Sequence, residues 1–172
     1  MLKSCARSWR SISTDRQTPG ASVVESIQEL RLVEFGLGGE TFATDVTEVT
    51  DILFVPQMTP VPGTPGEVMG LFNLRGVVTA LLDCSGLFNL RRQPRSRTTR
   101  ILVLEPVAGA GFALWADYVA DIATVDAAML APPPEGTPGV EMLRGVYNRG
   151  TGPTVVLDAA ALVEAPLFQQ YR

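Results

Sequence analysis

The carboxylates that could do chemistry in this sequence recur in pairs. Asp51 and Asp121 occupy equivalent places in an internal repeat, and so do Asp83 and Asp158. Paired carboxylates are typical of general acid/base catalysis. A duplication passes a structural role to both copies, whereas an active site is seldom kept twice. We therefore interpret these aspartates as turn or helix caps and expect no catalytic residue among them.

Other nucleophiles and metal ligands are scarce. The sequence has no histidine, which removes the commonest general base, the usual zinc ligand and every pairing of Ser or Cys with His. Its two cysteines, Cys5 and Cys84, are 79 positions apart and predict neither a disulfide framework nor a metal site. Cys84 follows an apolar strand and has no base to activate it, so we expect a buried small residue. The sequence thus predicts no enzyme, no cofactor and no metal.

One basic residue is isolated from all others. Arg75 is the only Lys or Arg in residues 32–90, and it precedes Gly76 in a predicted hairpin turn. At a hairpin tip its guanidinium can pair with a carboxylate of a partner protein. The alternative is an internal ion pair with Asp83 or Asp51 that holds the turn in place. The sequence alone leaves both interpretations open.

Composition restricts the remaining classes of function. The chain has 172 residues, 46% of them hydrophobic and 19% charged, which suffices for one globular domain or two very small ones. A net charge of −4 gives no general attraction to nucleic acid or anionic lipid. No apolar stretch is long enough to cross a bilayer and the first residues do not resemble a secretory signal, so we expect a cytoplasmic location.

Short strands must position these residues. From Leu30 onward the sequence consists of short apolar runs separated by Gly, Pro and Asp, a pattern that is typical of an all-β domain with many short strands. Glycines in the turns supply the positive φ that tight hairpins require. The predicted elements are a flexible tail at 1–28, a hairpin of 31–37 with 40–44, a Pro-rich loop at 56–66, a hairpin of 71–74 with 77–82, a short helix at 85–90 and a solvated Arg-rich connector at 91–100.

The sequence also repeats itself. Seven identities link residues 32–52 to residues 102–122 at an offset of 70, and a second series continues at an offset of 75. The copies cover about 30–90 and 101–165. The repeat alone predicts two small barrels side by side, which share an apolar seam and leave a groove where they meet. Alternation in the strands places three aromatic residues in the core, namely Phe42, Phe112 and Trp115.

Three segments together resemble the CheW family of chemotaxis coupling proteins. They are Phe42-Ala-Thr-Asp-Val-Thr-Glu-Val-Thr-Asp-Ile52, Thr59-Pro-Val-Pro-Gly-Thr-Pro65 and Gly70-Leu-Phe-Asn-Leu-Arg-Gly-Val-Val-Thr-Ala-Leu-Leu-Asp83. The resemblance covers about residues 30–165, and its most specific part is the Gly-x-x-Asn-Leu-Arg-Gly motif. It implies one CheW-like domain at 29–172, with two intertwined five-stranded SH3-like β-barrels and short helices.

The resemblance also implies a function without catalysis. CheW-like proteins are adaptors that bind the regulatory domain of the histidine kinase CheA and the cytoplasmic tip of methyl-accepting chemoreceptors. The family's partner contacts map here to Val49, Asp51, Gly70, Asn73, Arg75 and Gly76. Val49 and its repeat equivalent Val119 also fit core positions, and for Val119 the core is the better interpretation. Gly70 and Gly76 fit a role in backbone geometry.

The sequence departs from the family at one motif position. Many relatives have Asp-Leu-Arg after the strand, whereas this chain has Asp83-Cys84-Ser85. A contact made by that second arginine is therefore lost here, or supplied by Arg91 or Arg92.

Two other functions stay open. One is a CheW-like scaffold or decoy in another kinase pathway, such as type IV pilus or gliding motility, that binds partners without supporting kinase activation. The other, the weakest, is a barrel that binds a small molecule, which would need an apolar pocket with convergent polar groups.

Overall fold

Strands make up most of the described protein. The computed structural model describes residues 28–106, 109–150 and 152–171, so the tail predicted at 1–28 lies, except for Gln28, outside the described residues. Within these ranges the chain forms ten strands and one short α-helix, together with 3-10 helices. The all-β prediction is confirmed.

The element order follows the sequence repeat. The first copy contributes β1 (Glu29–Leu37), β2 (Glu40–Asp45), β3 (Val49–Leu53), β4 (Val68–Leu74) and β5 (Val77–Leu82). The second copy contributes β6 (Arg100–Leu104), β7 (Gly111–Ala116), β8 (Tyr118–Asp126), β9 (Leu143–Asn148) and β10 (Pro153–Leu157), followed by α1 (Ala159–Glu164). The 3-10 helices are Val46–Glu48, Ser85–Phe88, Ala127–Met129, Val140–Met142 and Pro166–Tyr171. Both predicted hairpins and the short helix after Asp83 are confirmed.

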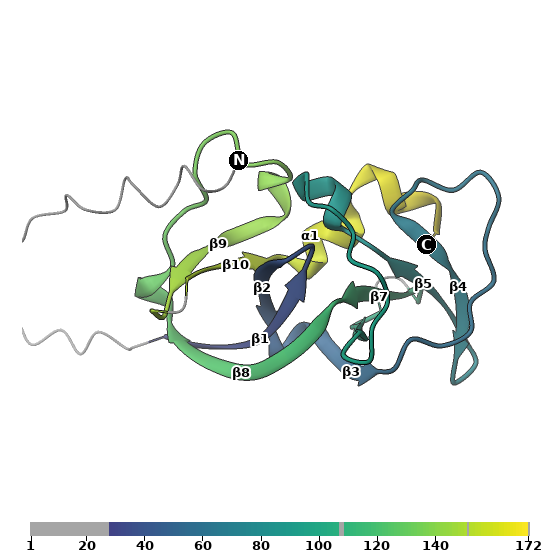
Figure 1. Cartoon of the computed structure of the whole chain (residues 1–172), viewed down its shortest axis with the longest axis horizontal. Helices are drawn as coiled ribbons and strands as arrows, with labels where there is room; N and C mark the ends of the chain where they lie inside the picture. Colours follow the sequence, from purple (N-terminus) through teal and green to yellow (C-terminus); the bar gives the residue numbers. More distant parts are fainter. Residues whose placement is uncertain (1–27, 107–108, 151, 172) are drawn as a thin grey trace, which may run out of the picture.

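The two sheets each combine strands from both copies. Sheet A has the order β8-β1-β2-β10-β9, and sheet B has the order β3-β6-β7-β5-β4. Figure 1 shows sheet A on the left and sheet B on the right. The two copies are joined by parallel pairs, β2 with β10 and β5 with β7, and they also exchange their third strands. The simple prediction of one barrel per copy is therefore wrong, and the intertwined five-stranded arrangement is confirmed.

In each sheet, a segment that follows one edge strand forms a single bridge to the other edge strand. Thr59, in the Pro-rich loop after β3, pairs with Leu71 of β4, and Ala131, after β8, pairs with Val146 of β9. The two bridges are related by the repeat. The Pro-rich loop is thus tied to the edge of sheet B next to the hairpin of β4 and β5.

The larger hydrophobic core runs through both sheets. The rings of Phe35 and Phe42 in sheet A stack with their centroids 6.2 Å apart. The centroid of the Phe42 ring lies 5.1 Å from that of Phe88, in the 3-10 helix that follows β5 of sheet B. The same core includes Leu102 of β6 and Leu162 of α1. The aromatic residues predicted for the core are buried, with exposed fractions of 3% for Phe42, 0% for Phe112 and 4% for Trp115. Because neither sheet has this core to itself, we expect the sheets to unfold together.

We predict that Leu102→Ala lowers the free energy of unfolding by about 2–5 kcal/mol, since Leu102 is fully buried. Native-state hydrogen exchange should then accelerate in the strands of both sheets. Ile122→Ala is the matched control, because Ile122 is 52% exposed and its truncation should cost less than about 0.5 kcal/mol. Loss of protection confined to sheet B would contradict a shared core.

Candidate functional site

The hairpin of β4 and β5 presents Arg75 to solvent. Its two turn residues both have left-handed backbone, with φ of 52° at Arg75 and 91° at Gly76, which is the geometry of a type I′ hairpin turn. The side-chain oxygen Oδ1 of Asn73 accepts a 2.8 Å hydrogen bond from the Gly76 N–H. Asn73 and Gly76 therefore build the turn, and the Arg75 side chain at its tip is 80% exposed.

Asp51 is the internal partner of Arg75. The Arg75 Nη2 donates to Asp51 Oδ2 at 3.1 Å, and Asp51 Oδ1 accepts from the backbone N–H of Ile52 at 2.9 Å. The contact joins the tip of the β4–β5 hairpin to β3. Of the two internal pairs that the sequence allowed, the structure forms the one with Asp51. Asp121, the repeat equivalent of Asp51, is exposed on β8 and has no ion pair within the described ranges.

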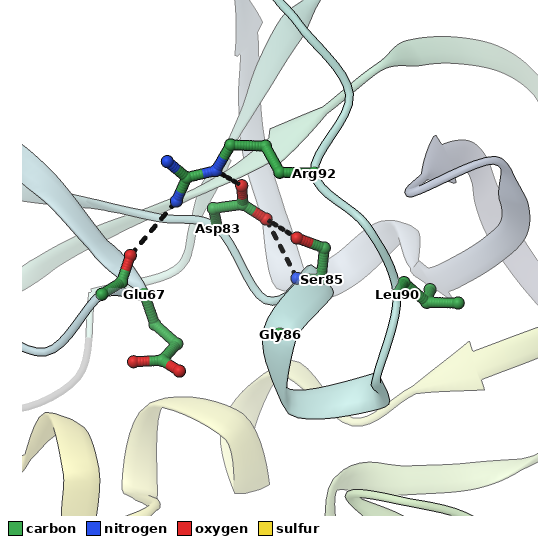
Figure 2. Close-up of a pocket in the computed structure, with 7 residues that line it drawn as sticks. Glu67, Asp83, Ser85, Gly86, Leu90 and Arg92 are labelled. Carbon is green, nitrogen blue, oxygen red and sulfur yellow. Dashed lines mark hydrogen bonds and ion pairs between the residues drawn. The ribbon is translucent and has the colours of Figure 1, made fainter.

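Asp83 is occupied by a different arginine. Its carboxylate is 1% exposed, and Oδ1 accepts from the Ser85 backbone N–H at 2.9 Å and from the Ser85 hydroxyl at 2.6 Å. Oδ2 forms an ion pair with Arg92 Nε, and Arg92 Nη2 donates to the Gly66 carbonyl at 3.1 Å. These contacts lie at an open hollow of about 400 Å³ that Glu67 and Leu90 also line. Figure 2 shows the bonds of Asp83 to Arg92 and Ser85. Arg92, one of the two substitutes named from the sequence, thus pairs with the aspartate that ends β5.

Asp158 has an equivalent role in the second copy. Its Oδ1 accepts from the Ala161 N–H at 2.8 Å and caps α1, and its Oδ2 lies 3.2 Å from Arg144 Nε. Arg144 also pairs with Glu48 and Asp45. Partial burial alone would lower the pKa of Arg144, but the bond to Asp158 and the nearby carboxylates raise it overall. The predicted turn or cap role is confirmed for Asp158, which caps α1, and for Asp83, whose carboxylate closes a turn with the Ser85 N–H. It is wrong for Asp51 and Asp121, which lie within β3 and β8.

Two further titratable groups, the Cys84 thiol and the Tyr147 hydroxyl, are buried. Cys84 is 2% exposed, and burial, together with the charges of Asp83 and Glu67, raises the pKa of its thiol. Burial also raises the pKa of Tyr147, whose hydroxyl donates to Glu34 Oε1 at 2.6 Å. Neither group is available as a nucleophile or base at neutral pH.

Val49 and Gly70 lie on the two strands that flank the Arg75 contact. Val49 is half-buried on β3 and packs against the larger core, as does Val119 on β8. Gly70 has φ of 151°, and a Cβ there would lie 2.8 Å from the Thr59 carbonyl oxygen. That carbonyl accepts the Leu71 N–H in the bridge that ties the Pro-rich loop to β4. Gly70 therefore permits close approach of the loop backbone.

The six residues predicted for partner binding thus lie on β3 and on the β4–β5 hairpin, at one end of which Arg75 contacts Asp51. Two exposed apolar residues on or next to β3 were not predicted from the sequence. Ile52 is 41% exposed and Phe54, just after β3, is 72% exposed. Ile52 and Phe54 alternate with Asp51 and Leu53, which indicates a strand with two different faces. The alternation does not indicate which of the two faces is exposed to solvent.

No group of three or more Cys, Asp or Glu side chains in the described ranges is placed to hold a metal ion. Among the helices of the described chain, none is both long and apolar enough to span a membrane.

The fold of this chain, with its two intertwined five-stranded sheets, is similar to the fold in the crystal structure of the scaffolding protein TtCheW from Thermoanaerobacter tengcongensis. The two structures align with a TM-score of 0.70 and 22% identity over 80% of this chain and 90% of that chain, which shows the fold. The model of the CheW-like domain matches residues 31–166. The chain belongs to the CheW-like family.

Its relatives include proteins with two different names. The chemotaxis protein CheW of Treponema pallidum (strain Nichols) is 28% identical over 148 residues, covering 83% of this chain and 87% of that protein. Protein PilI of Pseudomonas aeruginosa is 31% identical over 81 residues, covering 47% of this chain and 46% of that protein.

The close approach at Gly70 leads to a prediction about stability. Gly70→Ala places a methyl group against the Thr59 carbonyl and should lower the free energy of unfolding by about 1–3 kcal/mol. Gly66→Ala is the matched control, because a Cβ at Gly66 meets nothing within 4 Å. Equal melting temperatures for the two variants would show that the loop can move away and that Gly70 has no structural role.

The exposure of Arg75 predicts that its ion pair with Asp51 contributes little to stability. A double-mutant cycle with Arg75→Ala and Asp51→Ala should give a coupling free energy below about 1 kcal/mol, because the Arg75 side chain is 80% exposed and water screens the pair. Urea denaturation of the four proteins measures it. A coupling of several kcal/mol would assign Arg75 a structural role in place of binding.

Proposed function

We propose that this chain is a non-catalytic adaptor that couples methyl-accepting chemoreceptors to a CheA-type histidine kinase in chemotaxis-like signalling. Membership of the CheW-like family supports the adaptor role. The observation that carries the site is Arg75, a mostly exposed guanidinium at the tip of a rigid turn, beside the carboxylate of Asp51. The proposed partners are the regulatory domain of the kinase and the cytoplasmic tip of the receptor, so the adaptor works on the cytoplasmic side.

The geometry suits exchange of an ion-pair partner. Arg75 uses Nη2 for its bond to Asp51, and a guanidinium has five N–H donors, so further donors are free to meet a partner carboxylate. The turn fixes the arginine backbone before binding, which reduces the entropy lost on association. Val49 and Asp51 are both half-buried on β3, on either side of a shift in the register with β6. We infer that a partner helix contacts these residues of β3 and the hairpin tip together.

Coupling of this kind works by position. An exposed ion pair and a half-buried valine form a modest contact, and modest contacts can be rearranged when a receptor changes state. The adaptor then passes receptor state to the kinase by holding both in a fixed relation. The occupied aspartates Asp83 and Asp158 and the buried thiol of Cys84 support a function without catalysis.

The similarity to protein PilI favours a second candidate. That protein is not named as a chemotaxis protein, and it matches about half of this chain. The second candidate is therefore a CheW-like scaffold or decoy in another motility or two-component pathway. Both candidates use the same surface, and they differ in whether the bound kinase is activated.

We predict that Arg75→Glu weakens binding to a chemoreceptor cytoplasmic fragment or to a CheA regulatory domain by at least about tenfold, because the new carboxylate repels Asp51 and the partner's acidic group. Isothermal titration calorimetry with purified partners measures the change. Melting temperature should stay within about 2 °C of the parent, as is usual for a surface residue.

Arg149→Glu is the matched control. Arg149 lies after β9 in the equivalent hairpin of β9 and β10, where Asn148 Oδ1 accepts the Gly150 N–H at 2.8 Å. Its side chain is 50% exposed and its nearest carboxylate, on Glu34, is 3.8 Å away. Equal losses for both variants would point to general electrostatics, and an unchanged affinity for Arg75→Glu would contradict the proposed site. Binding that is intact but does not activate the kinase would select the scaffold or decoy.

A further inference from the structure

The Arg-rich connector carries a local charge that the rest of the chain does not. Residues 91–100 hold five of the chain's 14 basic residues and none of its 18 acidic residues. The sequence predicts a solvated connector here. In the structure three of its five arginines also bond to sheet B, to the loops beside it or to the connector itself. Arg92 reaches Asp83 and Gly66, Arg95 reaches the Val55 carbonyl, and Arg100 begins β6.

Four of the five connector arginines, all except Arg92, have no carboxylate partner in the described ranges, and three of these four lie close to Phe54 in the chain or in space. Arg95 Nη2 donates to the Val55 carbonyl at 3.1 Å, and Arg100 Nη1 donates to the carbonyls of Arg97 and Thr99 at 2.9 and 2.8 Å. These acceptors are neutral. Arg97 is exposed, and no carboxylate in the described ranges pairs with any of the three. By contrast, Arg75, Arg92, Arg144 and Arg149 each have a carboxylate partner.

An exposed aromatic ring lies among these charges. β3 pairs antiparallel with β6, with Leu53 opposite Ile101, so the next residue, Phe54, comes opposite Arg100. The Arg100 Cζ lies 4.1 Å from the centre of the Phe54 ring, which is cation–π geometry. Phe54 is 72% exposed, and Ile52 on the same side of β3 is 41% exposed. We call Ile52, Phe54, Arg95, Arg97 and Arg100 the cation–aromatic patch.

We propose that the cation–aromatic patch binds an acidic segment of a partner protein, one that presents carboxylates beside an apolar side chain. Carboxylates match the fork of guanidinium donors, and an apolar side chain can cover the exposed ring and Ile52. Arg100 is held by two carbonyls and by the ring, so its remaining donors are oriented before binding.

The charge balance favours a short acidic segment over a nucleic acid. Outside the connector, the rest of the chain contains all 18 acidic residues and only nine basic ones, so it is net negative. A long polyanion that extends beyond the patch is therefore repelled by the rest of the protein. A short segment that ends within the patch is not.

This surface is distinct from the proposed coupling site. Burial alternates along β3, so that Val49, Asp51 and Leu53 are half-buried while Thr50, Ile52 and Phe54 are exposed. The coupling-site residues of β3 and the patch residues Ile52 and Phe54 thus differ in exposure along one strand, and the other residues of the two sites lie on different elements, the β4–β5 hairpin and the connector. The patch does not depend on the identity of the kinase or the receptor, and the two proposals can fail separately.

The test is fluorescence anisotropy with the full chain and a short fluorescein-labelled peptide in which glutamates flank a pair of leucines. A second peptide has glutamine at every glutamate. We expect only the glutamate peptide to bind, and its affinity should fall as salt is added. Arg97→Glu should weaken binding by about fivefold or more, and Phe54→Ser by about threefold or more. Arg97 makes no side-chain bond in the described ranges, so this variant should fold normally.

Arg31→Glu is the matched control. Arg31 is an exposed arginine on β1 in sheet A, and its reversal makes the same change in net charge. Its affinity for the peptide should stay within about twofold of the parent. Equal loss with Arg31→Glu and Arg97→Glu, equal binding of the glutamine peptide, or the absence of any binding would each overturn the proposal. Tighter binding of a single-stranded oligonucleotide that Phe54→Ser abolishes would assign the patch to nucleic acid instead, and self-association that Arg97→Glu abolishes would assign it to a second copy.

Discussion

The parallel pairing of strands that are far apart in the sequence is the constraint on which the rest of this structure depends. β2 pairs with β10 and β5 pairs with β7, so neither copy of the repeat can complete a sheet alone. The larger core is built across both sheets for the same reason. A frame of this kind is stiff because a movement of one sheet disturbs packing in the other. The short strand β3 is held in that frame by β6, a strand of the other copy.

The frame gives β3 a central place in the proposed functions. The strand contributes the half-buried Val49 and Asp51 to the coupling site, and it exposes Ile52 and, just after its end, Phe54. Arg75 reaches this strand from the hairpin tip although its backbone is left-handed, a conformation that costs a non-glycine residue of the order of 1 kcal/mol. The bonds of the turn, above all the one from Gly76 to Asn73, offset that cost. The second hairpin has an asparagine at the equivalent position, Asn148, but this side chain accepts from Gly150, two residues on, and Gly150 stands where the first hairpin has Arg75, so the duplicated scaffold has diverged at the residue proposed to bind.

Local signals predicted much of this structure. The hairpins followed from turn residues, the buried aromatic residues from alternation, and the turn and cap roles of Asp83 and Asp158 from their recurrence. The order of strands in the sheets did not follow, because it depends on pairings such as Phe42 with Val155 that no local pattern specifies. For the candidate site, the sequence identified Asp51 and Asp83 as possible partners of Arg75, but the choice required the positions of β3 and Arg92. Phe54 was missed because its exposure depends on where β3 ends and on what covers it. Whether the six predicted residues bind a partner remains a prediction.

The most direct test of the account is an NMR titration of the isotope-labelled chain with an unlabelled chemoreceptor cytoplasmic fragment and, separately, with a CheA regulatory domain. The account predicts that one or both partners shift the backbone amide signals of β3 and of the β4–β5 hairpin, with the largest changes at Asp51, Arg75 and Gly76. Signals of the β9–β10 hairpin, which has Gly150 in the place of Arg75, should change least. Shifts confined to β8, β9 and β10, or no shift with either partner, would contradict the proposal that Arg75 and β3 form the coupling surface.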